Sequence, residues 1–219
     1  MKNAIRIVPI VVCALFLVRT TAIASILTQT ISPFTGSTIQ VKVTLDDAID
    51  LGNVRITVAV VPGVNTGDLR GLWLDISDDT LFSGLSVING PDITQAVFGP
   101  AGAVDDLGNG ANLNGGGTPA PFDMGFEIGG PGIGGGDDFQ STTFTLTHNS
   151  IELDNSLFAF QDLGVRVTCV GPLGDREGSS KLGGTFHDVP IISTGGEMPE
   201  PISLLVWCGL AVVVSLKRA

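Results

Sequence analysis

The sequence predicts an all-β ectodomain, an antiparallel β-sandwich with Greek-key-like connections and about eight to ten short strands. Apolar and polar residues alternate with period two in many segments, which is typical of strands that bury one face. Clusters of Gly, Asn, Asp and Pro separate these segments, as turns require. No window of this region combines the 3.6-residue period of an amphipathic helix with capping residues, so helices are expected only at the two ends of the chain.

The alternation predicts where the strands lie. They cover residues 39–45, 54–60, 72–76, 85–87, 93–98, 122–128, 140–147, 151–153, 158–160, 165–169 and 185–192. Cys169 shares the parity of Val165 and Val167, so we expect a small core residue there. Trp73 lies on the opposite face from Leu72, and we expect it to pack beneath a loop.

The segment from Gly99 to Gly136 contains fourteen glycines and is expected to be loop, apart from the strand at 122–128. Glycine loses more conformational freedom on ordering than any other residue. This segment should therefore be mobile unless other interactions fix it.

The first residues have the three parts of a secretory signal peptide. Lys2 and Arg6 give a positive start, residues 7–18 form an apolar stretch, and Ala22 and Ala24 form an A-x-A-like cleavage site. The apolar stretch is too short for a spanning helix. We therefore expect export through the Sec translocon and removal of residues 1–24 by cleavage after Ala24.

Four parts follow the signal peptide. They are a β-sandwich ectodomain at 25–193, a linker with a Pro-Glu-Pro motif at 194–201, an apolar transmembrane segment at 202–216 and a basic tail at 217–219. The ectodomain is long enough for one hydrophobic core. Cys13 and Cys208 lie in the two end segments, so Cys169 alone remains and no intramolecular disulfide is expected.

Charge is the most distinctive feature of the composition. The chain carries 11 basic and 22 acidic residues, and its formal net charge is −11. All of the acids lie between residues 25 and 200, and no Lys or Arg occurs between Gly71 and Val165. Such a surface repels phosphate backbones, so we exclude nucleic-acid binding. It is suited to a soluble exported protein, to divalent cations or to basic partners.

The C-terminal segment resembles the PEP-CTERM sorting signal of Gram-negative-type bacteria and cyanobacteria. The matching residues are Pro199, Glu200 and Pro201, the apolar span 202–216, and the basic pair Lys217 and Arg218. The resemblance implies an inner-membrane-anchored precursor that the membrane enzyme exosortase cleaves near the triplet. It also implies a final location at the cell surface or in the extracellular matrix. A plain C-terminal membrane anchor is the alternative.

The middle of the chain, residues 40 to 185, is similar to uncharacterised PEP-CTERM ectodomains of the cyanobacterial type. The segments that carry this similarity are Gly67–Trp73, Asn112–Gly117, Gly134–Asp138 and Glu177–Leu182. The resemblance implies no biochemical activity.

Catalytic signatures are absent from the sequence. There is no Gly-x-Ser-x-Gly elbow and no His-Glu-x-x-His motif. His148 is expected in a turn and His187 in a terminal strand, so a site that pairs them would be unusual. We therefore expect no enzyme and no catalytic residue, with a secreted hydrolase as a distant alternative.

Three groups of acids are candidates for structural calcium, which prefers carboxylate, amide and carbonyl oxygens on loops. They are Asp75 with Asp78 and Asp79, Asp105 and Asp106 with Asn109, and Asp137 with Asp138. None has the spacing of an EF-hand, and solvated turn acids are the simpler interpretation. No other cofactor is expected.

The sequence thus predicts an exported structural or interaction protein of the cell surface or matrix, with at least transient contact with the membrane. The alternative is a surface module that binds calcium or polysaccharide, and exopolysaccharide is one candidate partner. An exposed Trp73 would serve as a stacking platform for sugars.

Overall fold

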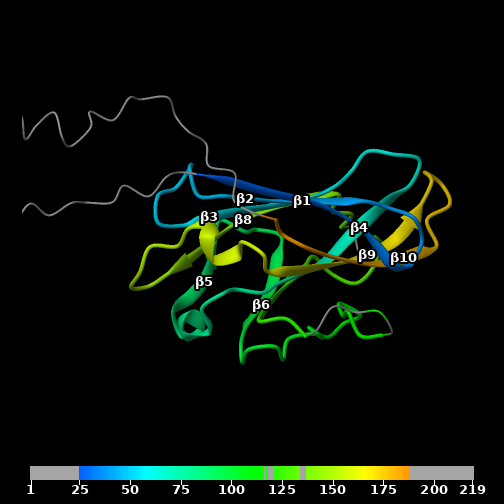
Figure 1. The fold of residues 1–219 in the computed structure, drawn as a ribbon. Coiled ribbons are helices and arrows are strands. Elements are labelled where there is room, and N and C mark those ends of the chain that lie inside the picture. The colour runs from blue at the N-terminus through cyan, green and yellow to red at the C-terminus, as the bar shows by residue number, and fades with distance from the viewer. Residues whose placement is uncertain (1–24, 116, 118–120, 134–136, 188–219) are drawn as a thin grey trace, which may run out of the picture.

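The computed structural model describes residues 25–115, 117, 121–133 and 137–187, which form ten antiparallel strands in one nearly closed sheet (Figure 1). The all-β, antiparallel prediction is confirmed. Two short 3-10 helices, η1 (Asp79–Gly84) and η3 (Asn155–Phe158), lie among the described residues. The expected signal-peptide and C-terminal helices lie outside these residues.

The strands follow one another around the sheet in the order β5-β8-β3-β2-β1-β10-β9-β4-β7-β6. Their bounds are β1 Ile26–Gly36, β2 Val41–Asp46, β3 Val54–Val60, β4 Thr66–Leu74, β5 Leu85–Ile88, β6 Ile93–Phe98, β7 Met124–Ile128, β8 Ser141–His148, β9 Asp162–Gly171 and β10 Gly178–Thr185.

Strand β1 joins the two halves of the sheet. Its first part, Ile26–Ile31, pairs with β2, and its second part, from Ser32 to Gly36, pairs with β10. The register shifts between Pro33 and Thr35, where proline cannot donate to the ladder. One strand therefore belongs to both layers, and the sheet folds over on itself.

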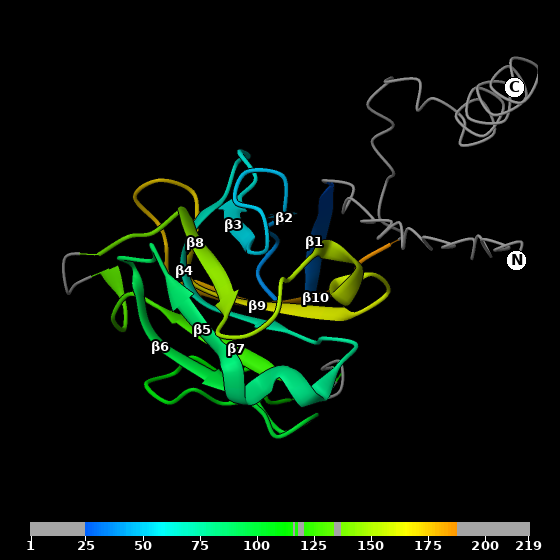
Figure 2. The same cartoon turned by 90° about the vertical axis from the view of Figure 1, so that its left-hand side faces the viewer.

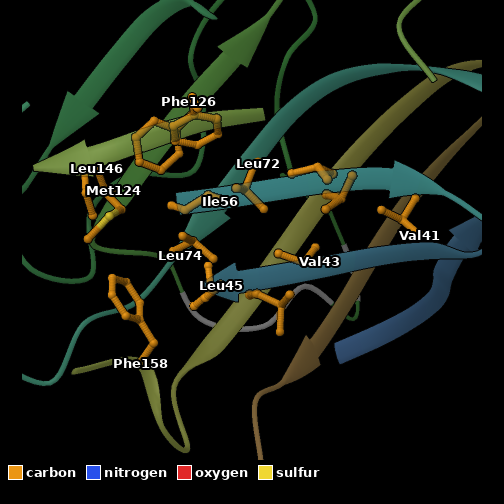
Figure 3. Packing of buried hydrophobic residues seen from close by; sticks show 14 of the residues in the cluster. Val41, Val43, Leu45, Ile56, Leu72, Leu74, Met124, Phe126, Leu146 and Phe158 are labelled. Carbon is orange, nitrogen blue, oxygen red and sulfur yellow. The ribbon is translucent and has the colours of Figure 1, made fainter. Parts of the chain in front are cut away.

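The main core lies between the two halves (Figure 3). Alternate residues of β2 and β3 contribute one side and are fully buried, among them Val43, Leu45 and Ile56. Leu72 and Phe126 contribute from β4 and β7 on the other half. The Phe126 and Phe144 rings pack with centroids 4.8 Å apart. The period-two pattern thus identifies the core-facing side of these strands.

A second, smaller cluster covers the outer face of β4 and β7. Trp73 is fully buried there beneath Val104, Leu107, Ala111, Leu113 and Phe122. The prediction that Trp73 packs beneath a loop is confirmed. The glycine-rich segment is fixed in part by this contact: the Leu107 amide donates to the Ala111 carbonyl at 2.9 Å, and Val104 pairs with Phe122. Phe122, the first residue of the expected strand 122–128, lies before β7 and belongs to this second cluster.

Several expected strands are wrong in position. Residues 151–153 form no strand, and in the expected strand 158–160 the first residue ends η3 and the other two form a turn. The last described strand is β10 at 178–185, whereas the prediction was 185–192. Cys169 is not in the core, because the β9–β10 register shifts between Gly178 and Ser180 and reverses the parity. Val170 is buried in its place, and Cys169 has a φ of 49°.

Candidate functional site

The first predicted calcium group does not converge on one point. Asp78 caps η1: its Oδ1 accepts from the Thr80 hydroxyl at 2.6 Å and from the Thr80 amide at 3.0 Å. These hydrogen bonds lower the pKa of Asp78. Asp79 is exposed in the first turn of η1, and Asp75 turns toward Asp123 on the adjoining segment.

Asp75 and Asp123 form a pair of facing carboxylates at the end of β4. Asp75 Oδ1 accepts from the Asp123 amide at 3.1 Å, and Asp123 Oδ2 accepts from the Ile76 amide at 3.0 Å. Asp123 Oδ1 also accepts from the Gly102 amide at 2.8 Å. Burial first and the Asp123 charge second raise the pKa of Asp75 to about 7. Asp75 therefore gains or loses its proton near neutral pH, well above the usual range of a carboxyl group.

The second group closes a turn of the segment that covers Trp73. Asp106 Oδ1 accepts from the Gly108 amide at 2.7 Å, and its Oδ2 faces the Asn114 side-chain amide at 3.5 Å. Asn109 adopts the left-handed conformation with φ 50°, which amide side chains tolerate in turns. Asp105 contributes its carbonyl to the Leu113 amide at 2.9 Å. This group therefore has a role in the turn itself.

The third group separates into two different contacts. Asp137 Oδ2 accepts from the Gly130 amide, while its Oδ1 is buried without a partner among the described residues. Asp138 forms a two-point ion pair with Arg176, at 2.6 and 2.7 Å. The Arg176 hydrogen bonds lower the pKa of Asp138.

Within the described ranges, no three His, Cys, Asp or Glu side chains are arranged to hold a metal ion. Most of these carboxylates already accept hydrogen bonds from other groups of the protein. The calcium assignments remain predictions from the sequence.

A buried ion pair that the sequence analysis did not select joins β4 to β7. Arg70 Nη2 lies 2.9 Å from Glu127 Oε1, and both side chains are almost fully buried. Arg70 Nη1 also donates to the Ile128 carbonyl at 2.5 Å. Nearby, burial raises the pKa of Asp68, although its oxygens accept from the Phe139 amide and the Thr168 hydroxyl. The sequence signal that could have found this pair is Arg70 itself, a basic residue within a largely apolar strand segment.

The two histidines follow different strands: His148 ends β8, and His187 lies two residues after β10. His148 ends β8, and its Nδ1 accepts from the amides of Ser150 and Ile151 at 3.1 Å each. His187 is exposed after Phe186, whose amide donates to the Gln161 carbonyl. His148 therefore stabilises a turn, as the sequence suggested.

An open groove of about 600 Å³ lies where the sheet fails to close, between β5 and β6. Figure 2 shows these two edge strands on the same side of the body. Half-buried Val87, Ile93 and Phe98 are among the residues that line the groove.

The sorting and processing residues lie outside the described part of the chain. They are Ala22, Ala24, Pro199, Glu200, Pro201, Lys217 and Arg218. Within the residues that the structure describes, no helix has the length and apolar character needed to cross a bilayer.

Comparisons of this chain with protein-family profiles, with curated proteins and with solved structures return no match.

Proposed function

We propose that this chain is an exported structural or interaction protein of the cell surface or extracellular matrix, with a β-sandwich body whose two layers share β1. A signal peptide directs it to the Sec translocon, and exosortase processes it at Pro199-Glu200-Pro201. The supporting observation for sorting is the succession of triplet, uncharged apolar span and basic pair at 199–218. The charged groups of the body support a scaffold role, because they stabilise loops and turns.

The proposed interaction surface is the unpaired edge of β6. Among the described residues β6 pairs only with β7. Exposed edges normally carry charges, proline or bulges that prevent pairing. Residues 93–98 contain no charge and no proline, and the register shift near Ile93 leaves the part from Gln95 to Phe98 regular.

The orientation of the β6 backbone follows from its neighbour. The Gly99 amide donates to the Asp123 carbonyl at 2.7 Å. Paired and unpaired positions alternate in an antiparallel ladder, so Val97 also bonds toward β7. The backbone groups of Ala96 and Phe98 therefore point away from β7, toward the groove where the sheet fails to close, and are available to another strand.

A second copy of this chain is the partner that the charge distribution favours. Between Thr80 and Val104 the only charged residue is Asp92, whose carboxylate accepts from the Thr142 hydroxyl at 2.9 Å. Two copies with a net charge of −11 repel each other least at such an uncharged edge. A basic partner would be drawn to the acidic loops instead.

Sorting is tested by the intact mass of the protein recovered from an exosortase-containing bacterium and from the same strain without exosortase. We expect loss of residues beyond the triplet only in the first strain, and none when Pro199 and Pro201 are both changed to Ala. A mature protein that retains Lys217 and Arg218 in both strains contradicts the proposal.

Self-association is tested by light scattering and sedimentation of the full chain in mild detergent. We expect Ala96→Pro and Ala96→Lys to weaken the dimer about tenfold or more, because the first removes an outward donor and the second adds a charge. Thr143→Lys is the matched control, with the same charge on an exposed residue of the interior strand β8. A dimer that survives both Ala96 substitutions contradicts the role of β6.

A further inference from the structure

Asp47 is a buried carboxylate that directly follows β2 and contacts Ser25, the residue before β1. Its exposed fraction is 6%, and that of Ser25, the residue it contacts, is 4%. Asp47 Oδ1 accepts from the Ser25 backbone nitrogen at 2.5 Å, and Oδ2 accepts from the Ser25 hydroxyl at 3.1 Å. The Asp47 amide donates to the Ser25 carbonyl at 3.3 Å. Three contacts therefore hold one residue against this acid.

Asn155 completes the enclosure from a segment that is distant in sequence. It is fully buried, and its amide donates to Asp47 Oδ2 at 2.9 Å. Its side-chain Nδ2 donates to the Ser25 carbonyl at 2.9 Å and to the Ser25 hydroxyl at 3.0 Å. Its Oδ1 is a buried acceptor without a partner among the described residues. We call Asp47, Asn155 and the groups around Ser25 the Ser25 cradle.

The Ser25 cradle lacks a cation. The ion pairs among the described residues are Arg70 with Glu127 and Arg176 with Asp138, and neither involves Asp47. A buried carboxylate with only neutral donors is costly, because water no longer stabilises its charge. An unpaired buried acceptor adds to this cost. A positively charged donor with several N–H groups would therefore stabilise this site better than a neutral amide does.

Ser25 is also the residue that follows the expected signal-peptide cleavage site, Ala22-Ile23-Ala24. Hydrolysis of the Ala24–Ser25 peptide bond by a signal peptidase adds water across that bond. The hydroxyl goes to the Ala24 carbonyl, and the Ser25 nitrogen takes up protons and becomes an α-ammonium group. The nitrogen that donates at 2.5 Å to Asp47 would then carry a positive charge.

We infer that the Ser25 cradle is a binding site for the new α-ammonium group of Ser25, which forms a buried ion pair with Asp47 once the signal peptide is removed. This inference rests on the proposed export and names the peptide bond that is cut. It also makes processing a step in stabilisation: the mature chain gains a charge partner for Asp47 that the precursor lacks. This ion pair does not depend on processing at the C-terminal Pro-Glu-Pro motif.

The first test is the N-terminal sequence of the protein recovered after export from a bacterial host. We expect Ser25 as the first residue. A different first residue overturns the inference. Its failure is distinguishable from failure of the sorting proposal, because the C-terminal mass reports exosortase cleavage independently.

The second test measures coupling between the amine and Asp47. Two mature forms are compared, one that begins at Ser25 and one with a single Gly inserted before Ser25, which moves the amine away. In each form the unfolding equilibrium constant is measured with and without Asp47→Asn. We expect Asp47→Asn to raise that constant at least about tenfold more in the Ser25 form than in the Gly-extended form.

Asp46→Asn is the matched control, because Asp46 is half-buried and its Oδ1 accepts only from the nearby Ala48 amide, at 2.9 Å. It should have the same small effect in both forms. An equal effect of Asp47→Asn in the two forms assigns Asp47 a purely structural role and overturns the inference.

Should Asp47→Asn prevent folding, Asn155→Asp supplies the second variant. The added carboxylate should favour the Ser25 form, and no difference between the forms counts against the inference.

Discussion

The carboxyl group of Asp75 and the backbone of Asp123 meet at 3.1 Å, while Asp123 Oδ2 accepts from the next residue along from Asp75, Ile76, at 3.0 Å. This exchange fastens the segment after β4 to the segment before β7, and it brings two acids together. Asp123 accepts two amide protons and Asp75 accepts one. Burial and the nearby Asp123 charge raise the pKa of Asp75 to about 7.

This pair predicts a loss of stability as the pH rises toward neutrality. The pKa of Asp75 is about 7 in the folded protein, above the value of about 3.9 expected in the unfolded chain. The folded state therefore binds the proton more tightly. The contribution is complete below about pH 4 and is lost as the pH rises through about 7. Because Asp75 is only half-buried, we expect a change of about 1–2 kcal/mol in the free energy of unfolding.

Denaturant titrations at pH 5 and pH 8 check this prediction with Asp75→Asn. The amide oxygen can still accept from the Asp123 amide, but it does not ionise. The variant should lose this part of the pH dependence and gain stability at pH 8 relative to the unsubstituted chain. Asp79→Asn, which removes a neighbouring exposed acid whose charge makes the smallest contribution to the raised pKa of Asp75, should keep most of the dependence. An Asp75→Asn profile parallel to that of the parent contradicts the assignment.

The Arg70–Glu127 pair predicts a large cost for removing one partner. Both side chains are almost fully buried at 2.9 Å, so Arg70→Met leaves the Glu127 carboxylate without its cation. We expect a loss of about 3–5 kcal/mol in the free energy of unfolding. The double variant Arg70→Met/Glu127→Gln should recover part of it, because no buried charge then remains.

The control for this prediction is Arg176→Met in the pair with Asp138. It also removes the cation, but the carboxylate left behind, Asp138, is 38% exposed, so water can still stabilise its charge and the loss should be smaller, about 1 kcal/mol. Chemical denaturation followed by circular dichroism compares the variants. Equal costs at the two sites would show that burial does not govern these ion pairs.

The sequence predicted β3 well because its buried apolar residues alternate with less buried ones. Strand β3 was predicted with its observed bounds, and β6 also coincides with its prediction. Strand β1 was missed because Gln29 occupies a half-buried position and Pro33 interrupts the pattern. In β10 a glycine stands where a side chain would be expected: a Cβ at Gly184 would lie 2.6 Å from the Ile31 side chain. Such close approaches depend on the partner strand, which local periodicity cannot reveal.

The charged sites could be predicted only as residue types. Acids near glycines were recognisable from spacing, but their partners lie far away in sequence: Asp138 meets Arg176, and Asp75 meets Asp123. Asp47 was not selected because its neighbours in the cradle, Ser25 and Asn155, are 22 and 108 residues away. Pairings across a folded sheet depend on topology, and topology was predicted only as a class.

The Trp73 cluster predicts that β4 tolerates no side chain at Gly71. A Cβ there would lie 2.6 Å from two ring atoms of Trp73, so Gly71→Ala must displace the indole from its cover. We expect a loss of about 1–3 kcal/mol in the free energy of unfolding, measured by urea denaturation. Gly63→Ala is the control, since its nearest neighbour would be 3.9 Å away, and it should change stability by less than about 0.5 kcal/mol. Equal effects would contradict the tight packing.

The three acidic groups can be tested for calcium binding by thermal unfolding. A ligand that binds only the folded state stabilises it, so a real site would raise the melting temperature in millimolar calcium. Asp78, Asp106 and Asp138 already accept hydrogen bonds from Thr80, Gly108 and Arg176, and binding would have to break these contacts. We therefore expect no change in melting temperature between calcium and a chelator at equal ionic strength. A rise that Asp106→Asn abolishes and Asp46→Asn leaves intact would instead assign calcium to the segment that covers Trp73.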